Sequence, residues 1–346
     1  MTDLAAKVRF LSDPGSYPHA TSSVAARETH MSWVFLTDDR VYKLKKPVRY
    51  PFLDFGTLAR RRFFCEEELR LNRRLAADTY CAVIPLRRTQ AGRLALSGRG
   101  RVVDWLVEMK RLPRADLLDV RLREGLVTEV DIRKAGELMA GFYSATPPVI
   151  EDGSLYLESL VREQTVNRAI LGQPTLGVSD AALPVLEVAD ARFAQLIPNI
   201  KARIRAGRIV EGHGDLRPEH VYIGTPTQVI DCLEFDRSLR IVDPYDEINY
   251  LGLECAMLGA GWVRPVLLDL LEARLGGRPD DDVLAFYGAF RMLLRARLCL
   301  AHLLDRVVRE PGKWSRLALS YIAAAKEELR SPSQPIRKSS HSHANA

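Results

Sequence analysis

Two aspartates on consecutive short loops are the residues of this sequence best suited to chemistry. Asp215 lies in His-Gly-Asp-Leu-Arg-Pro-Glu-His (213–220), and Asp231 follows sixteen residues later in Val-Ile-Asp-Cys-Leu-Glu-Phe-Asp. Carboxylates placed on two neighbouring loops can hold a phosphate-bound metal beside an acceptor hydroxyl. The pattern predicts phosphoryl transfer, in which Asp215 orients the hydroxyl and accepts its proton while Asp231 holds the metal.

The purely structural interpretation of an isolated His-Gly-Asp is a capped turn. Here the apolar, strand-like runs 221–223 and 229–230 lie on either side, and the second aspartate follows at a fitting distance. Gly214 allows the tight backbone that would aim Asp215 inward. These features together favour a site over a turn.

A small β-rich lobe is expected to precede these loops. Residues 31–44 have β-rich runs on either side of the polar pair Asp38-Asp39, which predicts a hairpin. Thr57 can cap a long helix over 58–77, and further strands are expected at 82–86, 93–96 and 102–109. A strand through residue 43 would place Val41, Lys43 and Lys45 on one face.

Beyond Pro113 the periodicity becomes helical. Helices are expected at 115–123, 131–144, 155–170, 180–206, from 246 onward, and at 265–275, 280–305 and 313–329. The sequence therefore predicts an α+β fold with two lobes. The expected division is a nucleotide-binding lobe at 1–110, a mainly helical catalytic lobe at 111–330 and a disordered tail at 331–346.

Composition narrows the class of protein. The chain has 346 residues, of which 47% are hydrophobic and 27% charged, with a formal net charge of +6. Basic residues alternate with acidic ones, which argues against a dedicated nucleic-acid surface. The five cysteines are widely spaced without a Cys-x-x-Cys pair, which favours a reducing cytoplasm. We expect neither an export signal nor a membrane span.

At this point the chain resembles a known group, the aminoglycoside phosphotransferase and choline kinase branch of the protein-kinase-like fold. The resemblance spans roughly residues 25–300 and is carried by a set of motifs. They are Glu28-Thr-His-Met-Ser-Trp-Val-Phe-Leu36, Tyr42-Lys-Leu-Lys-Lys-Pro-Val48, Phe52-Leu-Asp-Phe55, Cys65-Glu-Glu-Glu-Leu-Arg-Leu-Asn-Arg-Arg-Leu75, His213-Gly-Asp-Leu216 and Asp231-Cys-Leu-Glu-Phe235. More narrowly, it is similar to bacterial members of that family with no assigned substrate.

The resemblance implies a nucleotide site in the first lobe. Lys43 would bind the α- and β-phosphates, with Lys45 as the alternative, and a glutamate of the following helix would pair with the lysine. Glu68 is the first choice for that partner and Glu67 the second, because a buried ammonium without a partner is costly. The alternative interpretation of these charges is a solvated face.

Other nucleotide contacts are implied less strongly. Glu108 and Met109 resemble the hinge whose backbone hydrogen-bonds adenine. The segment expected to cover the phosphates, 29–33, contains no glycine, so only Ser32 and the backbone could cradle phosphate there.

The catalytic loop departs from the family pattern at His220, where the family has an asparagine. Imidazole is a poorer Mg²⁺ ligand than an amide oxygen and favours softer metals. The site could therefore bind one metal, prefer Mn²⁺ over Mg²⁺, or have lost turnover. A hydrogen-bonding scaffold role for His220 is the alternative.

Four further charged residues are candidates for acceptor contacts or support. Arg217 could contact the transferring phosphoryl group or an anionic substrate, or instead pair with Glu219. Glu234 follows Asp231 closely and is a candidate substrate contact. Arg291 and Arg295 are spaced to share one helical face, which could be a basic wall for an anionic acceptor or a solvated surface.

Glu247 lies in Asp243-Pro-Tyr-Asp-Glu-Ile-Asn249, which resembles the family's Asp-Pro-x-x-Asp-Leu segment. There the acidic residue braces the catalytic loop; the alternative is an acidic residue favoured by a helix N-terminus.

The expected function is therefore a cytoplasmic phosphotransferase that moves the γ-phosphoryl group of ATP or GTP, with Mg²⁺ or Mn²⁺, to a small-molecule hydroxyl. Two rivals are a nucleotide-binding pseudokinase with a scaffold role and a binder of nucleic acid or another anionic surface. The acceptor, the nucleotide preference and the oligomeric state do not follow from the sequence.

Overall fold

A computed structural model describes residues 3–50, 53–149, 153–301, 303 and 311–330. The chain divides into two compact units. The first comprises Met1–Tyr156 and Gly207–Gly277, and the second comprises Leu157–Ala206 and Arg278–Ala346.

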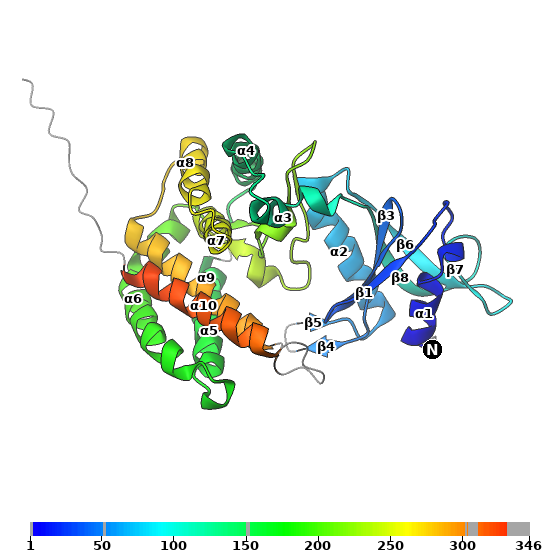
Figure 1. Ribbon diagram of the computed structural model, residues 1–346, viewed down its shortest axis with the longest axis horizontal. Coiled ribbons are helices and arrows are strands. Elements are labelled where there is room, and N and C mark those ends of the chain that lie inside the picture. Colours follow the sequence, from blue (N-terminus) through cyan, green and yellow to red (C-terminus); the bar gives the residue numbers. More distant parts are fainter. Residues whose placement is uncertain (1–2, 51–52, 150–152, 302, 304–310, 331–346) are drawn as a thin grey trace, which may run out of the picture. The chain divides into compact units, whose positions relative to one another are not determined.

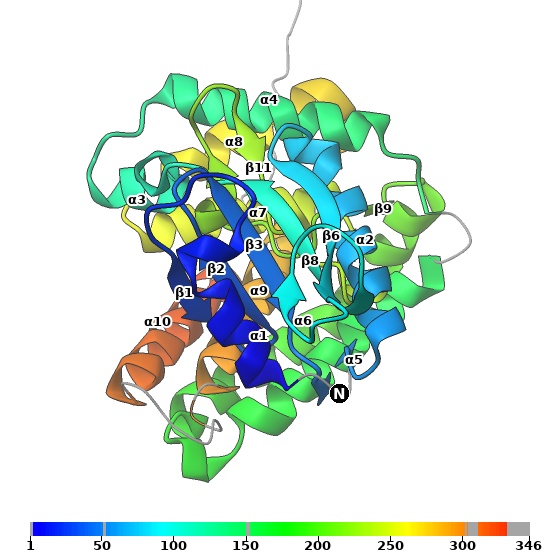
Figure 2. The ribbon, with the colours of Figure 1, turned by 90° about the vertical axis from the view of Figure 1, so that its right-hand side faces the viewer.

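A six-stranded antiparallel sheet dominates the start of the first unit, with strand order β1-β2-β3-β8-β6-β7 (Figure 2). Its strands are β1 (Ala25–Glu28), β2 (Ser32–Leu36), β3 (Arg40–Lys45), β6 (Tyr80–Arg88), β7 (Leu94–Ala95) and β8 (Arg101–Lys110). Strands β2 and β3 form the expected hairpin, in which Val34 lies opposite Lys43. The central strand β8 pairs with both β3 and β6.

Two helices cover opposite faces of this sheet: α1 (Leu4–Leu11) and α2 (Leu58–Ala76) (Figures 1 and 2). Alternation along β3 sorts its side chains between the faces. Tyr42 and Leu44 join Leu11 in the apolar core on the α1 side. Lys43 and Lys45 consequently lie on the face toward α2, where the Thr57 side chain caps the helix by accepting from the Arg60 amide.

The rest of the first unit is a set of short pairings and helices. Its remaining elements are β4 (Arg49–Tyr50), β5 (Leu53–Asp54), α3 (Leu118–Arg123), α4 (Glu129–Ala145), β9 (Val210–Glu211), β10 (Val221–Tyr222), β11 (Gln228–Val229), β12 (Ile241–Val242), α7 (Pro244–Met257) and α8 (Val263–Leu275). Short 3-10 turns occur at Pro14–Ser16, Arg114–Asp116, Pro218–His220 and Arg237–Arg240. Helix α8 packs against both α4 and α7 (Figure 1).

The second unit is helical throughout its described part. It contains most of α5 (Gly153–Leu171), then the 3-10 turn Pro174–Leu176, α6 (Ser179–Arg205), α9 (Asp281–Ala301) and α10 (Pro311–Arg330). Helices α6, α9 and α10 pack against one another. Arg168 joins α5 to α6 by donating to Asp190 at 2.7 Å.

The predicted α+β class, with an early sheet and later helices, is confirmed. The sequence pattern did not predict α1, a helix of eight residues whose N-cap residue, Asp3, makes no side-chain capping hydrogen bond. The predicted end of the 280–305 helix beyond residue 301 and the predicted tail at 331–346 lie outside the described residues, residue 303 excepted. The lobe boundary after residue 110 stays a prediction. In the described part of the chain, no helix is both long and apolar enough to cross a membrane.

A buried group of three charges ties α1 and α2 to the sheet. Asp104 on β8 is fully buried, and it accepts from Lys7 at 2.5 Å and from Arg61 through two hydrogen bonds of 2.7 and 3.1 Å. Lys7 and Arg61 are themselves buried. Removing the carboxylate would leave two buried cations facing each other without compensation.

We expect Asp104→Ala to lower the free energy of unfolding by about 3–5 kcal/mol, the usual cost of breaking a buried ion pair by removing one partner. The measurement is urea denaturation followed by circular dichroism. Glu66→Ala is the matched control, because it breaks the half-exposed Arg62–Glu66 pair on α2 and should cost at most about 1 kcal/mol. Equal losses in the two variants would show that the buried triad contributes nothing special.

Candidate active site

A cavity of about 590 Å³ lies within the first unit, between the α2 side of the sheet and the loops that follow β9 and β11. Its volume lies in the range of small-molecule sites. Eight of the residues singled out in the sequence line it: Ser32, Lys43, Glu68, Met109, Asp215, His220, Asp231 and Glu234. Residues 188 positions apart in sequence, Lys43 and Asp231, therefore meet in one cavity.

Glu68 is the centre of the charges in this cavity. Its side chain is buried, and its two carboxylate oxygens contact two lysines, Lys43 at 2.9 Å and Lys45 at 2.6 Å. Lys45 is fully buried and also contacts Glu234. Lys43 retains 17% exposure and reaches Asp231 at 3.0 Å. Both predicted lysines thus pair with the predicted glutamate, but only Lys43 faces the cavity.

Asp231 is held in an unusual backbone conformation. Its φ is 62°, in the left-handed region that side chains other than glycine rarely adopt. The Tyr80 hydroxyl accepts from its amide at 3.1 Å, and the next amide, that of Cys232, donates to Asn72 at 2.9 Å. The ammonium of Lys43 holds the pKa of Asp231 well below its ordinary value. The side chain is nevertheless 49% exposed, so the charged carboxylate is available to a ligand.

The His-Gly-Asp loop is braced from behind by Glu247 on α7. The buried carboxylate of Glu247 accepts from the amides of His213 and Gly214 and from the hydroxyl of Tyr143. Gly214 has φ of 91°, and a Cβ there would lie 3.1 Å from the Leu239 carbonyl oxygen. The loop therefore requires glycine at this position. Of the two interpretations of Glu247, its contacts match the brace.

His213 is a neutral, buried part of the same loop. Its Nδ1 accepts from the Asp215 amide at 3.3 Å, so Nε2 carries the proton and donates to the Ile230 carbonyl at 2.8 Å. Burial lowers its pKa below the ordinary value of 6.5. The ring joins the loop of Asp215 to Ile230, which lies between the end of β11 and Asp231.

Asp215 does not stand alone at the cavity. The Arg217 guanidinium lies 2.9 Å from its carboxylate and also contacts Glu219. Arg217 itself is not among the residues that line the cavity. In the structure, Arg217 is the partner of Asp215. A role of Arg217 toward a phosphoryl group or a substrate stays a prediction.

His220 lies between the two aspartates. Its Nδ1 donates to the Asp215 carbonyl at 2.7 Å, so that in the neutral tautomer Nε2 carries the lone pair. That Nε2 lies 3.7 Å from the carboxylate of Asp231 and 3.4 Å from Arg217. A nitrogen and a carboxylate oxygen at this separation can share a divalent ion.

The donor set fits a metal that is bound together with phosphates. Among the described residues, no group of three or more His, Cys, Asp or Glu side chains could hold a metal by itself. Mg²⁺ in nucleotide sites commonly takes one or two protein carboxylates, with phosphate oxygens and water as the other ligands. Asp231 and His220 would provide two protein ligands and do not form a complete set of metal ligands by themselves.

The predicted phosphate cover and hinge are placed at the edges of the cavity. Ser32 begins β2 in a tight turn, in which its amide donates to the Thr29 hydroxyl at 2.9 Å. Met109 lines the cavity from within β8, whereas the Glu108 carboxylate accepts from Tyr42 on the other face of the sheet. Strand β8 ends at Lys110, and the segment that follows it along the cavity begins at Arg111, two residues after the predicted hinge residue Met109.

The two arginines predicted for the acceptor belong to the second unit. Arg291 and Arg295 lie on its helix α9. Arg291 is buried, and Arg295 stacks on the Tyr321 ring at 5.3 Å. Their approach to an acceptor stays a prediction.

Three contacts that position the site were not predicted from the sequence. They are made by Tyr80, by Asn72, and by Glu234 with Lys45. Asn72 links the carbonyl of Glu68 to the amide of Cys232. A signal was present for Asn72, because it lies one helical turn after Glu68 and would share its face. No local signal marks Tyr80, whose partner is 151 residues away.

Three solved structures share this arrangement of elements, each at low sequence identity. A spectinomycin phosphotransferase in complex with ADP and spectinomycin is 10% identical with a TM-score of 0.51, and the match covers 90% of this chain and 95% of that one. A choline/ethanolamine kinase family protein from Mesorhizobium loti is 14% identical with a TM-score of 0.52, covering 94% and 96%. Choline kinase from Cryptosporidium parvum is 9% identical with a TM-score of 0.52, covering 95% and 96%.

The chain has the kinase-like fold. No family model matches the sequence of this chain. Uncharacterized protein Rv2004c of Mycobacterium tuberculosis is 29% identical over 280 residues, which is 80% of this chain and 54% of that protein. Uncharacterized protein Mb2027c of Mycobacterium bovis matches to the same extent. The chain thus spans about half the length of the curated relatives that it matches.

The buried, neutral state of His213 predicts a pH dependence of stability. Its folded pKa is lowered below 6.5, so the unfolded chain binds the proton first and stability falls as pH drops below 6.5. The slope from one such group is at most about 1.4 kcal/mol per pH unit. We expect His213→Gln to lose less stability than the wild type between pH 6.5 and 5, measured by urea denaturation at each pH.

His30→Gln is the control for this comparison, because it removes an exposed imidazole. If His213→Gln and the wild type had parallel stability profiles across this pH range, the neutral assignment of His213 would be wrong.

Proposed function

We propose that the chain transfers the γ-phosphoryl group of ATP or GTP to a hydroxyl of a small molecule. The observation that carries the proposal is the meeting, in one cavity, of Lys43 paired with Glu68, the braced loop of Asp215, and the exposed carboxylate of Asp231. Phosphoryl transfer depends on positioning and on charge placed around the phosphates. The kinase-like fold supports the same conclusion by analogy.

Each residue then has a distinct part. Lys43 is the cation for the nucleotide phosphates, and Glu68 holds its ammonium in place. Asp215 orients the acceptor hydroxyl and accepts its proton as the new bond forms. Asp231 and His220 would hold Mg²⁺ or Mn²⁺, which would supply positive charge to offset that of the phosphates.

Two roles of Arg217 are compatible with this scheme. Its ion pair with Asp215 fixes the direction of the carboxylate before a substrate arrives. An acceptor with an anionic group could take over the guanidinium and release Asp215 toward the hydroxyl. Polycationic acceptors would gain nothing from Arg217.

Substitution of the two aspartates tests the roles. We expect Asp215→Asn to lower kcat by roughly 10²–10⁴-fold, as for a lost general base, while nucleotide binding persists. Asp231→Asn should also lose metal-dependent nucleotide binding. The assay follows ADP release over a panel of hydroxyl compounds that includes choline, ethanolamine and spectinomycin, and calorimetry follows binding.

Asp236→Asn is the matched control, because Asp236 lies on the same loop outside the cavity and accepts from the Ser238 amide. Full activity in Asp231→Asn, or equal loss in Asp236→Asn, would contradict the proposed metal site.

Metal preference tests His220 separately. Imidazole favours Mn²⁺ relative to an amide oxygen, so His220→Asn should raise activity with Mg²⁺ relative to activity with Mn²⁺. Initial rates with each metal at saturating nucleotide give the ratio. An unchanged ratio would indicate that His220 supports the loop through its bond to the Asp215 carbonyl and does not touch the metal.

A nucleotide-binding pseudokinase is the second candidate, and one observation favours it. Both aspartates are already engaged, Asp215 by Arg217 and Asp231 by Lys43. If these pairs persist with nucleotide bound, transfer would not occur. Thermal stabilisation by ATP without ADP release across the acceptor panel, unchanged in Asp215→Asn, is the result that this candidate requires.

A further inference from the structure

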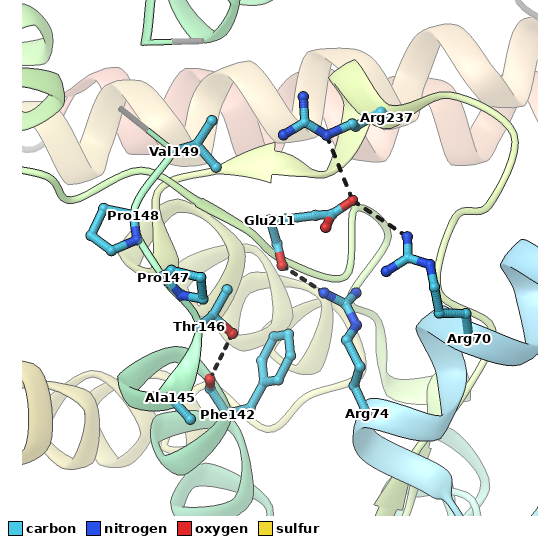
Figure 3. Close-up of a pocket in the computed structure, with 10 residues that line it drawn as sticks. All are labelled: Arg70, Arg74, Phe142, Ala145, Thr146, Pro147, Pro148, Val149, Glu211 and Arg237. Atoms are coloured by element: carbon cyan, nitrogen blue, oxygen red, sulfur yellow. Dashed lines mark hydrogen bonds and ion pairs between the residues drawn. The ribbon is translucent and has the colours of Figure 1, made fainter. Parts of the chain in front are cut away.

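A second cavity, of about 760 Å³, lies in the first unit on the other side of α2 (Figure 3). One side of it is basic, with Arg70 and Arg74 from α2 and Arg237 from the loop before β12. The other side is apolar and comes from the end of α4 and the segment after it. Its residues are Phe142, Ala145, Pro147, Pro148 and Val149. None of these groups has a part in the function proposed above.

Among the described residues, arginines outnumber carboxylates at this cavity. The three lining arginines and the buried Arg240 lie around two glutamates, Glu67 and Glu211, which gives these six residues a formal charge of +2. Glu211 is closely paired with Arg240 at 2.9 Å, whereas Arg70 and Arg237 lie only at 4.0 and 3.9 Å from it. Figure 3 shows Arg70 and Arg237 directed at this carboxylate, and Arg74 directed at the backbone carbonyl of Glu211.

Two of the arginines are placed to accept a ligand. Arg70 and Arg237 are 52% and 51% exposed. A guanidinium has five N–H donors, and two from Arg70 are used on Glu67. Arg74 is different, because it donates to the carbonyls of Glu211 and Gly212 and stacks on Phe142, and so builds the floor of the cavity.

The two sides of the cavity define the orientation of a ligand. Guanidinium forks match the oxygens of phosphate esters and bind them through several N–H groups at once. The carboxyl end of α4, where Ala145 is the last helical residue, has a partial negative charge that disfavours an anion. The anion would therefore face the arginines, and an apolar or ring-shaped body would cover the proline and phenylalanine wall.

We propose that this cavity is a second ligand site, distinct from the nucleotide cavity, which binds a phosphate monoester with an apolar or aromatic body. The phosphate lies between Arg70 and Arg237. The organic part lies on Phe142, Pro147 and Pro148. Binding there does not depend on the function proposed for the first cavity.

The test uses phenyl phosphate as the probe and isothermal titration calorimetry on the full chain, with and without a saturating non-hydrolysable ATP analogue. We expect saturable binding that the analogue does not displace. Arg70→Gln with Arg237→Gln should weaken it roughly tenfold or more, the loss expected for charge-assisted hydrogen bonds. Inorganic phosphate should bind more weakly than phenyl phosphate, because it leaves the apolar wall uncovered.

Two further variants separate the cavity from general surface charge. Ala145→Trp fills the exposed apolar side without removing a charge, and it should abolish binding of the probe. Arg60→Gln with Arg62→Gln is the matched control, because it removes two half-exposed, ion-paired arginines of the same helix that lie outside the cavity. Binding of phenyl phosphate to this control variant should be unchanged.

Absence of saturable binding, displacement by the nucleotide analogue, equal affinity for inorganic phosphate, or equal weakening in the Arg60/Arg62 control would each overturn the proposal. A protein that bound phenyl phosphate as expected but transferred no phosphoryl group would refute only the proposed function.

Discussion

The carboxylate of Glu68 is buried, and a buried carboxylate must be neutralised where it lies. Two ammonium groups do this, Lys43 and Lys45, and both come from one face of one strand. This requirement sets which face of β3 is directed toward α2. Glu234 and Asp231 contact the same two lysines, Glu234 through Lys45 and Asp231 through Lys43. The geometry of the first cavity follows from that neutralisation.

Helix α2 is shared between the two cavities because of its period. Residues two apart lie about 200° from each other around a helix, and residues four apart lie on one face. Glu68 therefore faces the first cavity, and Asn72, on the same side of the helix, accepts from the Cys232 amide. Arg70 and Arg74 face the second cavity. A single helix thus carries two sets of polar contacts on opposite sides.

The loops at the first cavity show how support from distant residues sets local conformation. Glu247 satisfies two amides of the His-Gly-Asp turn, and Tyr80 satisfies the amide of Asp231 in its left-handed conformation. Buried amides left without such partners would cost free energy. The protein itself consequently holds the conformation that presents Asp215 and Asp231, which is the preorganisation that the proposed phosphoryl-transfer function requires.

Local pattern alone determined the hairpin of β2 and β3, the capped helix α2 and the late helices, because strand alternation, capping and helical period act over a few residues. It also identified eight of the residues that line the first cavity, since their types are set by the chemistry. Only the tertiary structure decided that Lys45 is enclosed while Lys43 faces the cavity, that Arg217 pairs with Asp215, and that Tyr80 supports Asp231. These outcomes depend on contacts between segments far apart in the chain, and no local period or turn signal encodes which partner a charge will meet.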